Sequence, residues 1–533
     1  MAKNVAARNR SGRETYETDI QGFYNGANVL ITGATGFVGK VLLEKLLRSC
    51  PGISSIYLLV RKKDEKDGET RINEMFQKSV FEKLWSASPG FRKKIIVIEG
   101  DISAEGLGVS PEDRQLLMQR VNVVFHLAAA TSPDESLKNA VLSNVRGTKD
   151  LLQLCGQCPR LKGMVFMSTA FCHFYRSALG EEFYKVTVSD KMALELVENM
   201  EEDWLQDITP RLVGAWPNTY TLTKGIAEGV VNTYGGSLPV GVFRSSTVVS
   251  TNAEPISGWI DNPRGIMAGV LALSLGRMRT ARLSKDCVAD LVPCDMVANA
   301  LIVAAWDVHE RKRLGDEQAV YNFVSSFSQP ITWDELAGLI VKHSWHTPST
   351  AASWAVSFTP VLSPVLYWML VLLLHLLPAL LADVGLLLSG HKTKMLNRYR
   401  HQQTQLNLYS KVCNQTWIFN SGNVDRLRSL LSEQDSAKFD FNPKELDWEE
   451  FVKNCLVGLR TYILGESPLT LSKAIKKRNR LYMLHQLIKI SLLCIFVWLF
   501  WLAARAILIW TETTDVGVLI INRISGHAQM HNM

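Results

Sequence analysis

A tyrosine and a lysine four residues apart, Tyr220 and Lys224, are the side chains of this sequence best suited to acid–base chemistry. On a helix, residues at this spacing share one face, so both can address the same bound molecule. A phenol with a pKa of about 10 exchanges protons poorly at neutral pH unless a nearby positive charge stabilises its phenolate. The pair therefore predicts a proton-transfer site in which Lys224 tunes Tyr220; the alternative is an ordinary surface helix.

Hydroxyl and amide side chains that could complete such a site occur earlier in the chain. Ser168 and Thr169 directly follow a β-rich run, where a hydroxyl can hydrogen-bond the carbonyl of a substrate. The sequence does not choose between the two, and either hydroxyl could instead satisfy local backbone groups. Asn144 fits a supporting role, in which it reaches Lys224 through water.

A glycine-rich loop predicts where a nucleotide binds. Residues 29–31, Val-Leu-Ile, run straight into the sequence TGATGFVGK, which opens a helix. Here the first glycine allows a tight turn, the second lets the backbone approach a pyrophosphate, and the third permits close helix–strand packing. The phosphates are expected at the helix N-terminus, where free amides and the helix dipole favour negative charge. The cofactor-binding residues predicted in this loop are Thr32, Gly33, Thr35, Gly36, Phe37, Val38 and Gly39.

The end of the second β-rich run distinguishes NADPH from NADH. An acidic residue there would bind the ribose hydroxyls of NADH, but the run Ile56–Val60 is followed by Arg-Lys-Lys and only then by Asp64. Positive charge suits a 2′-phosphate, so we predict NADPH, with Arg61 at that phosphate; the alternative is a solvated basic loop. Other residues assigned to the cofactor are Asp101 and Ile102, which could meet the adenine, and Ala128, which could back the cofactor. Lys224, which would also hold the nicotinamide ribose, and Asn144 complete the predicted cofactor-binding set.

Short β-rich runs alternate with helical stretches from Asn28 to about Val324. Strands separated by whole helices imply βαβ units and a parallel sheet covered on both faces. The sequence therefore predicts an α/β fold, a doubly wound Rossmann parallel sheet, with a mainly helical C-terminal domain and a C-terminal membrane segment. The expected strands are Val29–Thr32, Ile56–Val60, Ile95–Glu99, Val123–His126, Met164–Ser168 and Val240–Phe243, and the expected helices include Lys40–Arg48 and Leu137–Leu154.

Two apolar stretches bear on membrane binding, since a bilayer core needs roughly 20 apolar residues in a helix. Ile490–Trp510 reaches that length by including Arg505, and the basic segment Lys473–Arg480 precedes it. The positive-inside rule then places the bulk of the protein in the cytosol. Val361–Leu381 is interrupted by prolines, and we expect it to be membrane-embedded or a hydrophobic wall, with 391–467 cytosolic. The glycosylation sequon at Asn414 offers a test of that placement.

Composition sets further limits on the class of protein. The net charge of +7 over 533 residues forms no long basic stripe, so nucleic-acid binding has little support. Nine scattered cysteines indicate reduced thiols, and we predict no metal site. The N-terminus lacks the apolar segment of a secretory signal peptide. We divide the chain into a polar N-terminal tail (1–24), an NADPH-binding reductase domain (25–350), a hydrophobic membrane-associated segment (351–390), a C-terminal domain (391–467), and a basic linker, transmembrane segment and tail (468–533).

Taken together, these motifs resemble the alcohol-forming fatty acyl-CoA reductases, a family of extended short-chain dehydrogenases/reductases, over nearly the whole chain. In the first domain the similar stretches are the nucleotide loop, the YxxxK motif leading to Glu228, and Glu254–Asn262, EPISGWIDN. A plain sugar-nucleotide epimerase is not expected to carry EPISGWIDN. Trp417–Asn420 and Phe439–Phe451, which ends in LDWEEF, are similar to the family's C-terminal domain.

The resemblance implies NADPH-dependent reduction of a long-chain fatty acyl-CoA to a primary fatty alcohol, through a thiohemiacetal and an aldehyde, with release of CoA. Tyr220 would donate a proton to each developing oxyanion, and Ser168 or Thr169 would orient it. Such alcohols are precursors of waxes and ether lipids. Two alternatives stay open: a dehydrogenase of the same superfamily acting on a sterol or another lipid alcohol, and a catalytically impaired lipid-binding paralogue.

The sequence departs from the family pattern at three places that we expect to line or neighbour the substrate cleft. Thr131-Ser132-Pro133 replaces a Val-Arg-Phe-like stretch, Phe171 stands where tyrosine is frequent, and Ser245 follows Arg244 where proline is usual. These departures bear on the preferred acyl chain length and on turnover. The expected location is the membrane of the endoplasmic reticulum or the peroxisome, with the catalytic domain facing the cytosol. The expected partners are a long-chain acyl-CoA and membrane lipid, and a homodimer stays open.

Overall fold

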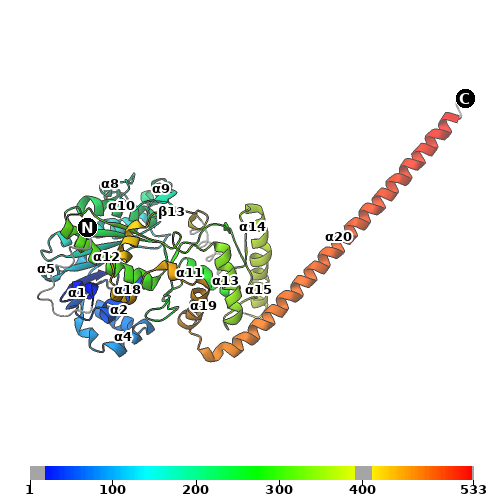
Figure 1. Ribbon diagram of the computed structural model, residues 1–533. Coiled ribbons are helices and arrows are strands. Elements are labelled where there is room, and N and C mark those ends of the chain that lie inside the picture. The colour runs from blue at the N-terminus through cyan, green and yellow to red at the C-terminus, as the bar shows by residue number, and fades with distance from the viewer. Residues whose placement is uncertain (1–17, 391–410, 531–533) are drawn as a thin grey trace.

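A seven-stranded parallel sheet forms the centre of the protein in the computed structural model (Figure 1), which describes residues 18–390 and 411–530, the side chains of 511–530 excepted. The strand order is β11-β7-β5-β4-β1-β2-β3, and every neighbouring pair is parallel. The predicted doubly wound α/β fold is therefore confirmed. The strands are β1 (Asn28–Thr32), β2 (Ser55–Val60), β3 (Ile95–Glu99), β4 (Val123–His126), β5 (Gly163–Thr169), β7 (Val240–Ser245) and β11 (Val320–Phe323).

The order of the strands locates the site. The chain proceeds outward from β1 to β2 and β3 on one side, and then continues from β4 on the other side of β1. In doubly wound sheets, ligands bind beyond the carboxyl ends of the strands at this reversal. The carboxyl ends of β1 and β4 here carry Thr32 and His126, which lie side by side in the register. The nucleotide loop therefore opens at the position that this topology favours.

Helices cover the sheet on both faces because its central strands are buried apolar runs, as in other parallel sheets. One face packs against α2 (Phe37–Ser49) and α12 (Cys294–Leu314). The other packs against α5 (Pro111–Arg120), α7 (Gly147–Gly156) and α10 (Thr219–Tyr234). Besides α1 (Asp19–Tyr24), the other α-helices of the described residues up to 350 are α3 (Gly68–Phe76), α4 (Glu82–Ala87), α6 (Leu137–Val141), α8 (Asp190–Asn199), α9 (Glu202–Val213), α11 (Ile266–Ser274) and α13 (Trp333–His346).

Three local features differ from the sequence prediction. The end of the predicted polar tail forms helix α1 (Asp19–Tyr24), in which buried Tyr24 donates a hydrogen bond of 2.9 Å to the carbonyl of Ile302. The rest of that tail, residues 1–17, lies outside the described residues. The predicted helix Leu137–Leu154 contains a π turn at Leu142–Arg146 between α6 and α7. The edge strand β11 matches none of the predicted strands, because it is short and contains Asn322.

The C-terminal region shares the core of the first domain. Its helices are α17 (Gly422–Leu430), α18 (Glu433–Lys438) and α19 (Trp448–Gly458), and α19 packs against α13. Strand β13 (Ile418–Phe419) pairs in parallel with β6 (Ala178–Leu179). Buried apolar residues of this region belong to the same cluster as those of β1 and α12. Residues 411–467 thus form one body with the reductase domain, while 391–410 lie outside the described residues. The other short strands are β8 (Thr247–Val249), β9 (Thr280–Ala281), β10 (Leu291–Pro293) and β12 (Thr359–Pro360).

The EPISGWIDN segment contacts both α2 and the C-terminal region. A Cβ atom on Gly458 would lie 1.7 Å from the carbonyl oxygen of Gly258, so α19 approaches the segment as closely as two glycines allow. At the ends of the segment, Glu254 pairs with Lys45 at 2.7 Å, and Asp261 pairs with Lys40 at 2.6 Å. Both lysines lie on α2, the helix that follows the nucleotide loop. The segment therefore connects the nucleotide-binding helix to the C-terminal region.

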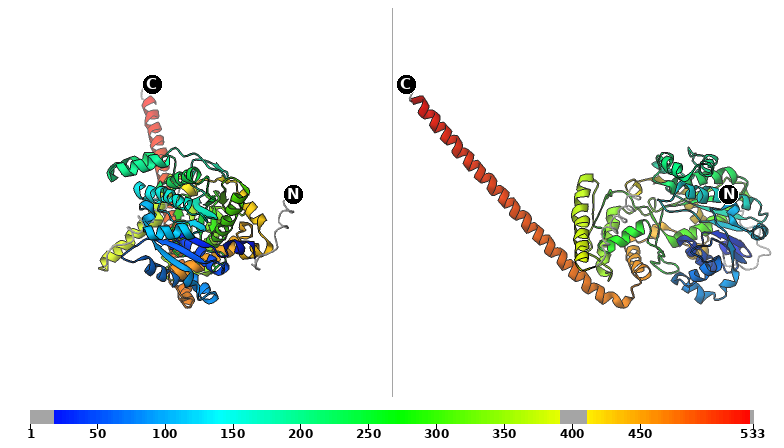
Figure 2. Two further views of the ribbon diagram at one scale, coloured as in Figure 1. Left: turned by 90° about the vertical axis from the view of Figure 1, so that its left-hand side faces the viewer. Right: turned by 180° about the vertical axis from the view of Figure 1, so that it is seen from behind.

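Two helices in the described part of the chain are long and apolar enough to cross a membrane, Pro364–Leu388 and Pro468–Trp510. The first consists of α14 (Pro364–Val371), a π turn (Leu372–Leu376) and α15 (Leu377–Leu388). It packs along one side of the body, with most of its apolar side chains exposed. The second belongs to α20 (Leu471–Met530), which leaves the body and projects far beyond it (Figures 1 and 2).

Candidate functional site

The nucleotide loop has the close approaches that its glycines predict. Gly33 has a φ of +80°, and a Cβ atom there would lie 2.6 Å from the backbone nitrogen of Ala128. A Cβ on Gly39 would lie 2.2 Å from the Gly33 carbonyl oxygen. Gly36 is exposed and caps α2 without any side-chain hydrogen bond, so the first amides of α2 remain available. The loop therefore presents a helix N-terminus to which the pyrophosphate of a dinucleotide can bind.

A buried set of hydrogen bonds fixes the base of this loop. The hydroxyl of Thr32 lies 2.7 Å from Nδ1 of His126 and accepts a hydrogen bond of 3.2 Å from the backbone N–H of Ala128. His126 Nε2 lies 3.1 Å from the hydroxyl of Thr148. Burial, assisted by the charge of Lys224, lowers the pKa of His126 to about 3, so the imidazole is neutral at physiological pH. The sequence prediction included Thr32 and Ala128 but missed His126, which ends β4 directly beside Thr32.

Two guanidinium groups lie near the end of β2, that of Arg61 directly after the strand and that of Arg71 on α3. The Arg61 side chain is exposed and lies 4.0 Å from Asp101. Arg71, from α3, donates to the Arg61 carbonyl and, at 3.4 Å, to the hydroxyl of Thr35 in the nucleotide loop. The Asp101 carboxylate accepts a hydrogen bond of 2.9 Å from the backbone of Ser103. Sequence reasoning found Arg61 and Asp101 but missed Arg71, because nothing in α3 indicates that it returns to the loop.

The predicted catalytic pair lies on α10, whose first turn is capped by the Asn218 side chain, 2.9 Å from the N–H of Thr221. Tyr220 is half-buried and Lys224 is buried one turn further along. The Lys224 ammonium lies over the ring of Phe166 on β5, 4.1 Å from its centroid. Burial lowers the pKa of Lys224 to about 7, against the opposing effect of Glu228. Helix α10 thus carries, one turn after Tyr220, an ammonium group of reduced basicity.

Asn144 connects the β4 loop to α10. Its side chain accepts a hydrogen bond of 2.8 Å from the N–H of Ala130 and donates one of 3.1 Å to the carbonyl of the same residue. It also donates at 3.0 Å to the hydroxyl of Thr223, which precedes Lys224. Asn144 lies in the π turn, an element that often marks functional sites. The contact with Thr223 gives Asn144 a direct structural link to α10.

The two candidate hydroxyls at the end of β5 have different surroundings. The Ser168 oxygen is fully shielded and has no hydrogen-bond partner of good geometry, with the Cys172 thiol as its polar neighbour. The Thr169 oxygen accepts a hydrogen bond of 3.3 Å from the N–H of Phe171, which leaves the hydroxyl proton free to be donated.

Ile102, predicted at the adenine, contacts α7 through its backbone, because its carbonyl oxygen would lie 2.5 Å from a Cβ atom on Gly147. Ile102 therefore packs tightly against α7.

A buried ion pair between Glu228 and Arg244 holds α10 to its neighbours. Glu228, one turn after Lys224, accepts hydrogen bonds from Arg244 Nε at 2.9 Å and Nη2 at 2.7 Å. Burial opposes ionisation, but Arg244 and His173 lower the pKa of the Glu228 carboxyl well below its ordinary value. Arg244 also donates to the carbonyls of Gly180 and Glu182, near β6. Sequence reasoning did not find this network, although Glu228 stands at helical spacing from Lys224.

The same network contains a group with the spacing of metal ligands. Donor atoms of Cys172, His173 and Glu228 all lie within 4.8 Å of one another and are buried. The Glu228 carboxylate, however, already has the guanidinium of Arg244 on both oxygens. Burial also raises the pKa of the Cys172 thiol well above its ordinary value, which disfavours the thiolate that a metal needs. These three residues are therefore part of an ion-pair network that holds α10 to β7.

The C-terminal region forms a wall beside the end of β5. Phe171 packs against Trp417 with a centroid distance of 5.1 Å and against Phe419 at 6.5 Å. Ser245 is buried and pairs with Thr169 in the sheet register. Two of the three departures from the family pattern thus lie next to the candidate hydroxyl, whereas Thr131 is exposed. That they neighbour the substrate cleft stays a prediction.

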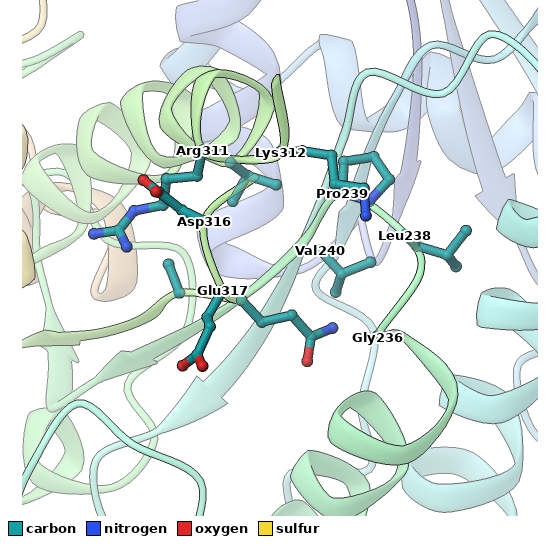
Figure 3. Close-up of a pocket in the computed structure, with 11 residues that line it drawn as sticks. Gly236, Leu238, Pro239, Val240, Arg311, Lys312, Asp316 and Glu317 are labelled. Carbon is teal, nitrogen blue, oxygen red and sulfur yellow. The ribbon is translucent and has the colours of Figure 1, made fainter. Parts of the chain in front are cut away.

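A surface pocket elsewhere in the described structure is remote from these groups. Figure 3 shows it between the loop after α10 and the end of α12, with Pro239, Val240, Arg311 and Lys312 in its wall. These residues adjoin the amino ends of β7 and β11. The candidate catalytic and cofactor residues instead lie at the carboxyl ends of the strands. The pocket is therefore separate from the site.

Comparisons with known proteins agree with this arrangement. Two family models described as male sterility protein match the chain, an NAD-binding model over residues 31–301 and a second model over 374–466. The chain is 36% identical to fatty acyl-CoA reductase wat of Drosophila melanogaster over 469 residues, covering 88% of this chain and 90% of the relative. It is 34% identical to fatty acyl-CoA reductase 1 of Homo sapiens over 464 residues, covering 87% and 89%.

Solved structures show the same fold at lower identity. The reductase domain of a non-ribosomal peptide synthetase from Mycobacterium tuberculosis aligns with a TM-score of 0.54 and 20% identity, covering 82% of this chain and 92% of that domain. The terminal reductase domain of the myxalamid biosynthetic pathway gives a TM-score of 0.52 and 20% identity, covering 82% and 90%. The fold is thus that of reductase domains, and the sequence relatives match this chain over most of its length. This chain is an oxidoreductase that belongs to the fatty acyl-CoA reductase family.

Proposed function

We propose that this protein reduces a long-chain fatty acyl-CoA to the primary fatty alcohol, with NADPH as hydride donor, through an aldehyde and with release of CoA. The observation that carries the proposal is the arrangement of α10, which carries Tyr220 and Lys224 one turn apart and packs against β5, with the Lys224 ammonium over the ring of Phe166. The N-terminus of α2, which follows the glycine-rich loop, is exposed and can bind the pyrophosphate of the cofactor. Membership in the fatty acyl-CoA reductase family supplies the substrate class.

The residues of the chain have separate roles in this reaction. NADPH, when bound, supplies the hydride that reduces the carbonyl carbon. Tyr220 donates a proton to the carbonyl oxygen as negative charge develops on it, and the Thr169 hydroxyl stabilises the same oxygen by a hydrogen bond. Lys224 holds the nicotinamide ribose, and its ammonium favours the ionised form of the tyrosine side chain one helical turn before it. The thiohemiacetal formed first loses CoA as its C–S bond breaks, and the same side chains act on the resulting aldehyde carbonyl in a second reduction that uses a second NADPH.

The preference for NADPH is proposed from the two guanidinium groups at the end of β2. Arg61 follows β2, and Arg71 donates a hydrogen bond to its carbonyl. An arginine near the end of the second strand can accommodate a ribose 2′-phosphate, which it binds in a bidentate manner. We expect the double variant Arg61→Ala/Arg71→Ala to raise the KM for NADPH about tenfold or more, and to change that for NADH little. Steady-state kinetics with both cofactors measures this, with the exposed Lys83→Ala as control. Equal losses with both cofactors would contradict the proposal.

We also propose that α20 anchors the protein in the membrane of the endoplasmic reticulum or the peroxisome, with the catalytic domain in the cytosol. The basic segment Lys473–Arg480 before the apolar stretch supports this orientation. The sequon supports it too. Asn414 accepts a hydrogen bond of 2.6 Å from the N–H of Ser284 and donates one of 3.0 Å to the carbonyl of Arg282, so its amide is used within the folded body.

The reaction is tested with membranes that contain the full chain. Membranes with the wild type or with Tyr220→Phe are incubated with NADPH and acyl-CoAs of several lengths, and the lipids are identified by mass spectrometry. We expect fatty alcohol from the wild type and almost none from the variant, with the chain-length preference read from the products. Oxidation of a sterol or another lipid alcohol without any fatty alcohol would favour a different dehydrogenase. Binding of NADPH and acyl-CoA without turnover would favour a lipid-binding paralogue.

A further inference from the structure

The helix Pro364–Leu388 is apolar over its length, yet it packs on the body by one narrow stripe. Its buried side chains are Tyr367, Val371, His375 and Asp383, which follow one another at multiples of four residues and so share one face. The rest of its surface is apolar and exposed, a patch far larger than soluble proteins usually show. The exposed large apolar residues are Val365, Leu366, Trp368, Met369, Leu372, Leu373, Leu377, Leu380, Leu381, Val384, Leu387 and Leu388.

The chain on both sides of this helix belongs to the same folded body. Before it, β12 pairs with β9. After it, the buried Trp417 and strand β13 pack against β6 and Phe171. A single crossing by Pro364–Leu388 would place these two parts on opposite sides of a bilayer. The intervening sequence 391–410 carries four lysines and arginines and contains no apolar run of the length a second crossing needs.

A chain of contacts fixes the depth of the helix relative to the anchor α20. At the centre of the helix, His375 Nε2 accepts a hydrogen bond of 3.4 Å from the N–H of Arg279. The Arg279 guanidinium lies 5.5 Å from the ring centroid of Trp354, whose indole N–H donates at 3.1 Å to Nδ1 of His485 on α20. His485 precedes the apolar stretch that begins at Ile490 by five residues, or about 7 Å of helix. The middle of Pro364–Leu388 therefore lies at the level where α20 enters the membrane.

Basic and aromatic side chains mark that level as the headgroup region. Arg478 on α20 lies over the ring of Trp345, 4.1 Å from its centroid, and Trp345 contacts Tyr482 at 5.2 Å. Tryptophan and tyrosine concentrate at membrane–water interfaces, and lysine and arginine beside them attract anionic lipids. Trp368 on α14 is 57% exposed and adds an indole ring to the exposed apolar surface of the helix. Figures 1 and 2 show α14 and α15 inclined to α20 at the side of the body from which α20 leaves.

From these observations we infer that Pro364–Leu388 does not span the bilayer but lies in the plane of the cytosolic leaflet, as a second membrane contact whose occupant is an anionic phospholipid surface. Its apolar face enters the boundary between headgroups and acyl chains, and its stripe of Tyr367, Val371 and His375 stays on the protein. The inference rests on the proposed anchor α20 and not on the proposed reaction. It places the body flat against the leaflet, held by two apolar helices rather than by one tether.

Depth measurements with spin labels on the full chain test this inference. Single cysteines replace Val365, Leu373 or Leu381, which are 72%, 55% and 64% exposed, in a background with Cys287→Ser and Cys494→Ser; the other seven cysteines are buried. The protein is reconstituted into vesicles of phosphatidylcholine with a fifth of phosphatidylserine. Accelerated relaxation by oxygen and by a water-soluble nickel chelate gives the depth of each label. Labels at Val497 on α20 and Leu314 at the end of α12 serve as membrane and aqueous references.

We expect the three helix labels at one shallow depth, just below the phosphates. A spanning helix would separate Val365 from Leu381 by about 24 Å along the bilayer normal, with Leu373 deepest, and would overturn the inference. Contact with a second copy of the chain would also overturn it, and would appear as low oxygen exposure with magnetic coupling between labels. A shallow Val497 would refute the anchor itself. None of these outcomes depends on turnover, so a failed reaction assay and a failed membrane contact remain distinguishable.

Discussion

Ser168 and Thr169 are adjacent in the sequence but differ in what surrounds their hydroxyl groups. The Ser168 oxygen is sealed within the fold, whereas Thr169 accepts an N–H bond and keeps its proton for a second partner. A hydroxyl that stabilises a developing oxyanion must be able to donate toward the substrate. At the level of single residues, the structure therefore distinguishes two candidates that the sequence left equivalent.

This difference gives a prediction for a matched pair of variants. Thr169→Val removes the donor and keeps the side-chain shape, so kcat should fall about a hundredfold, as for the loss of an oxyanion donor. Ser168→Ala removes a hydroxyl that has no good partner, and kcat should stay within about threefold of the wild type. Steady-state turnover of a fixed acyl-CoA measures both variants. A reversed order would assign the role to Ser168.

The reduced basicity of Lys224 predicts a dependence of cofactor affinity on pH. Its pKa is about 7 in the free protein, and the negative charge of a bound dinucleotide raises the pKa again. The protonated form binds better, so affinity should be greatest below pH 7 and should fall by up to tenfold per pH unit above it. Binding at pH 8 should take up a proton, which calorimetry in buffers of different ionisation enthalpy detects. The uptake should vanish in Lys224→Met, and its persistence there would refute the assignment.

At the scale of elements, the EPISGWIDN segment explains why two distant motifs occur together. Gly258 in this segment and Gly458 at the end of α19 are 200 positions apart in the numbering, and their backbones touch. Glu254 and Asp261 at the ends of the segment pair with lysines on α2. The nucleotide-binding helix and the C-terminal region therefore share one support, which a fold with only the sheet and its helices would lack.

Two glycine-to-alanine substitutions distinguish the effect of the Gly258–Gly458 contact on stability from the general effect of alanine on helix stability. In Gly458→Ala the new methyl group would lie 1.7 Å from a backbone oxygen, so the backbones must move apart and the free energy of unfolding should fall by about 1–3 kcal/mol or more. Gly338→Ala on α13 meets no atom within 4 Å and should raise it by about 0.5–1 kcal/mol. Denaturant unfolding of the full chain in detergent measures both. Equal stabilities for the two variants would contradict the proposed role of the contact.

At the scale of the whole molecule, the sequence predicted the parts whose signals are local. The central strands could be located because each is an apolar run. The glycine loop joins β1 to α2 and the YxxxK pair lies on a helix, as their sequence patterns indicate. Three features arise from contacts between distant segments and leave no local pattern: edge strand β11, Arg71 at the nucleotide loop, and the ion pair of Glu228 with Arg244. The shared core of the reductase and C-terminal regions is likewise visible only in the folded chain.

The transfer of isotope from the cofactor tests the central claim of this account most directly. Membranes with the full chain receive an acyl-CoA and NADPH that carries deuterium at both C4 positions of the dihydronicotinamide. We predict a primary alcohol with two deuterium atoms on C1, because both reductions take hydride from the cofactor, and no such product from Tyr220→Phe. Alcohol without deuterium, or equal amounts of deuterated alcohol from the variant, would contradict the account.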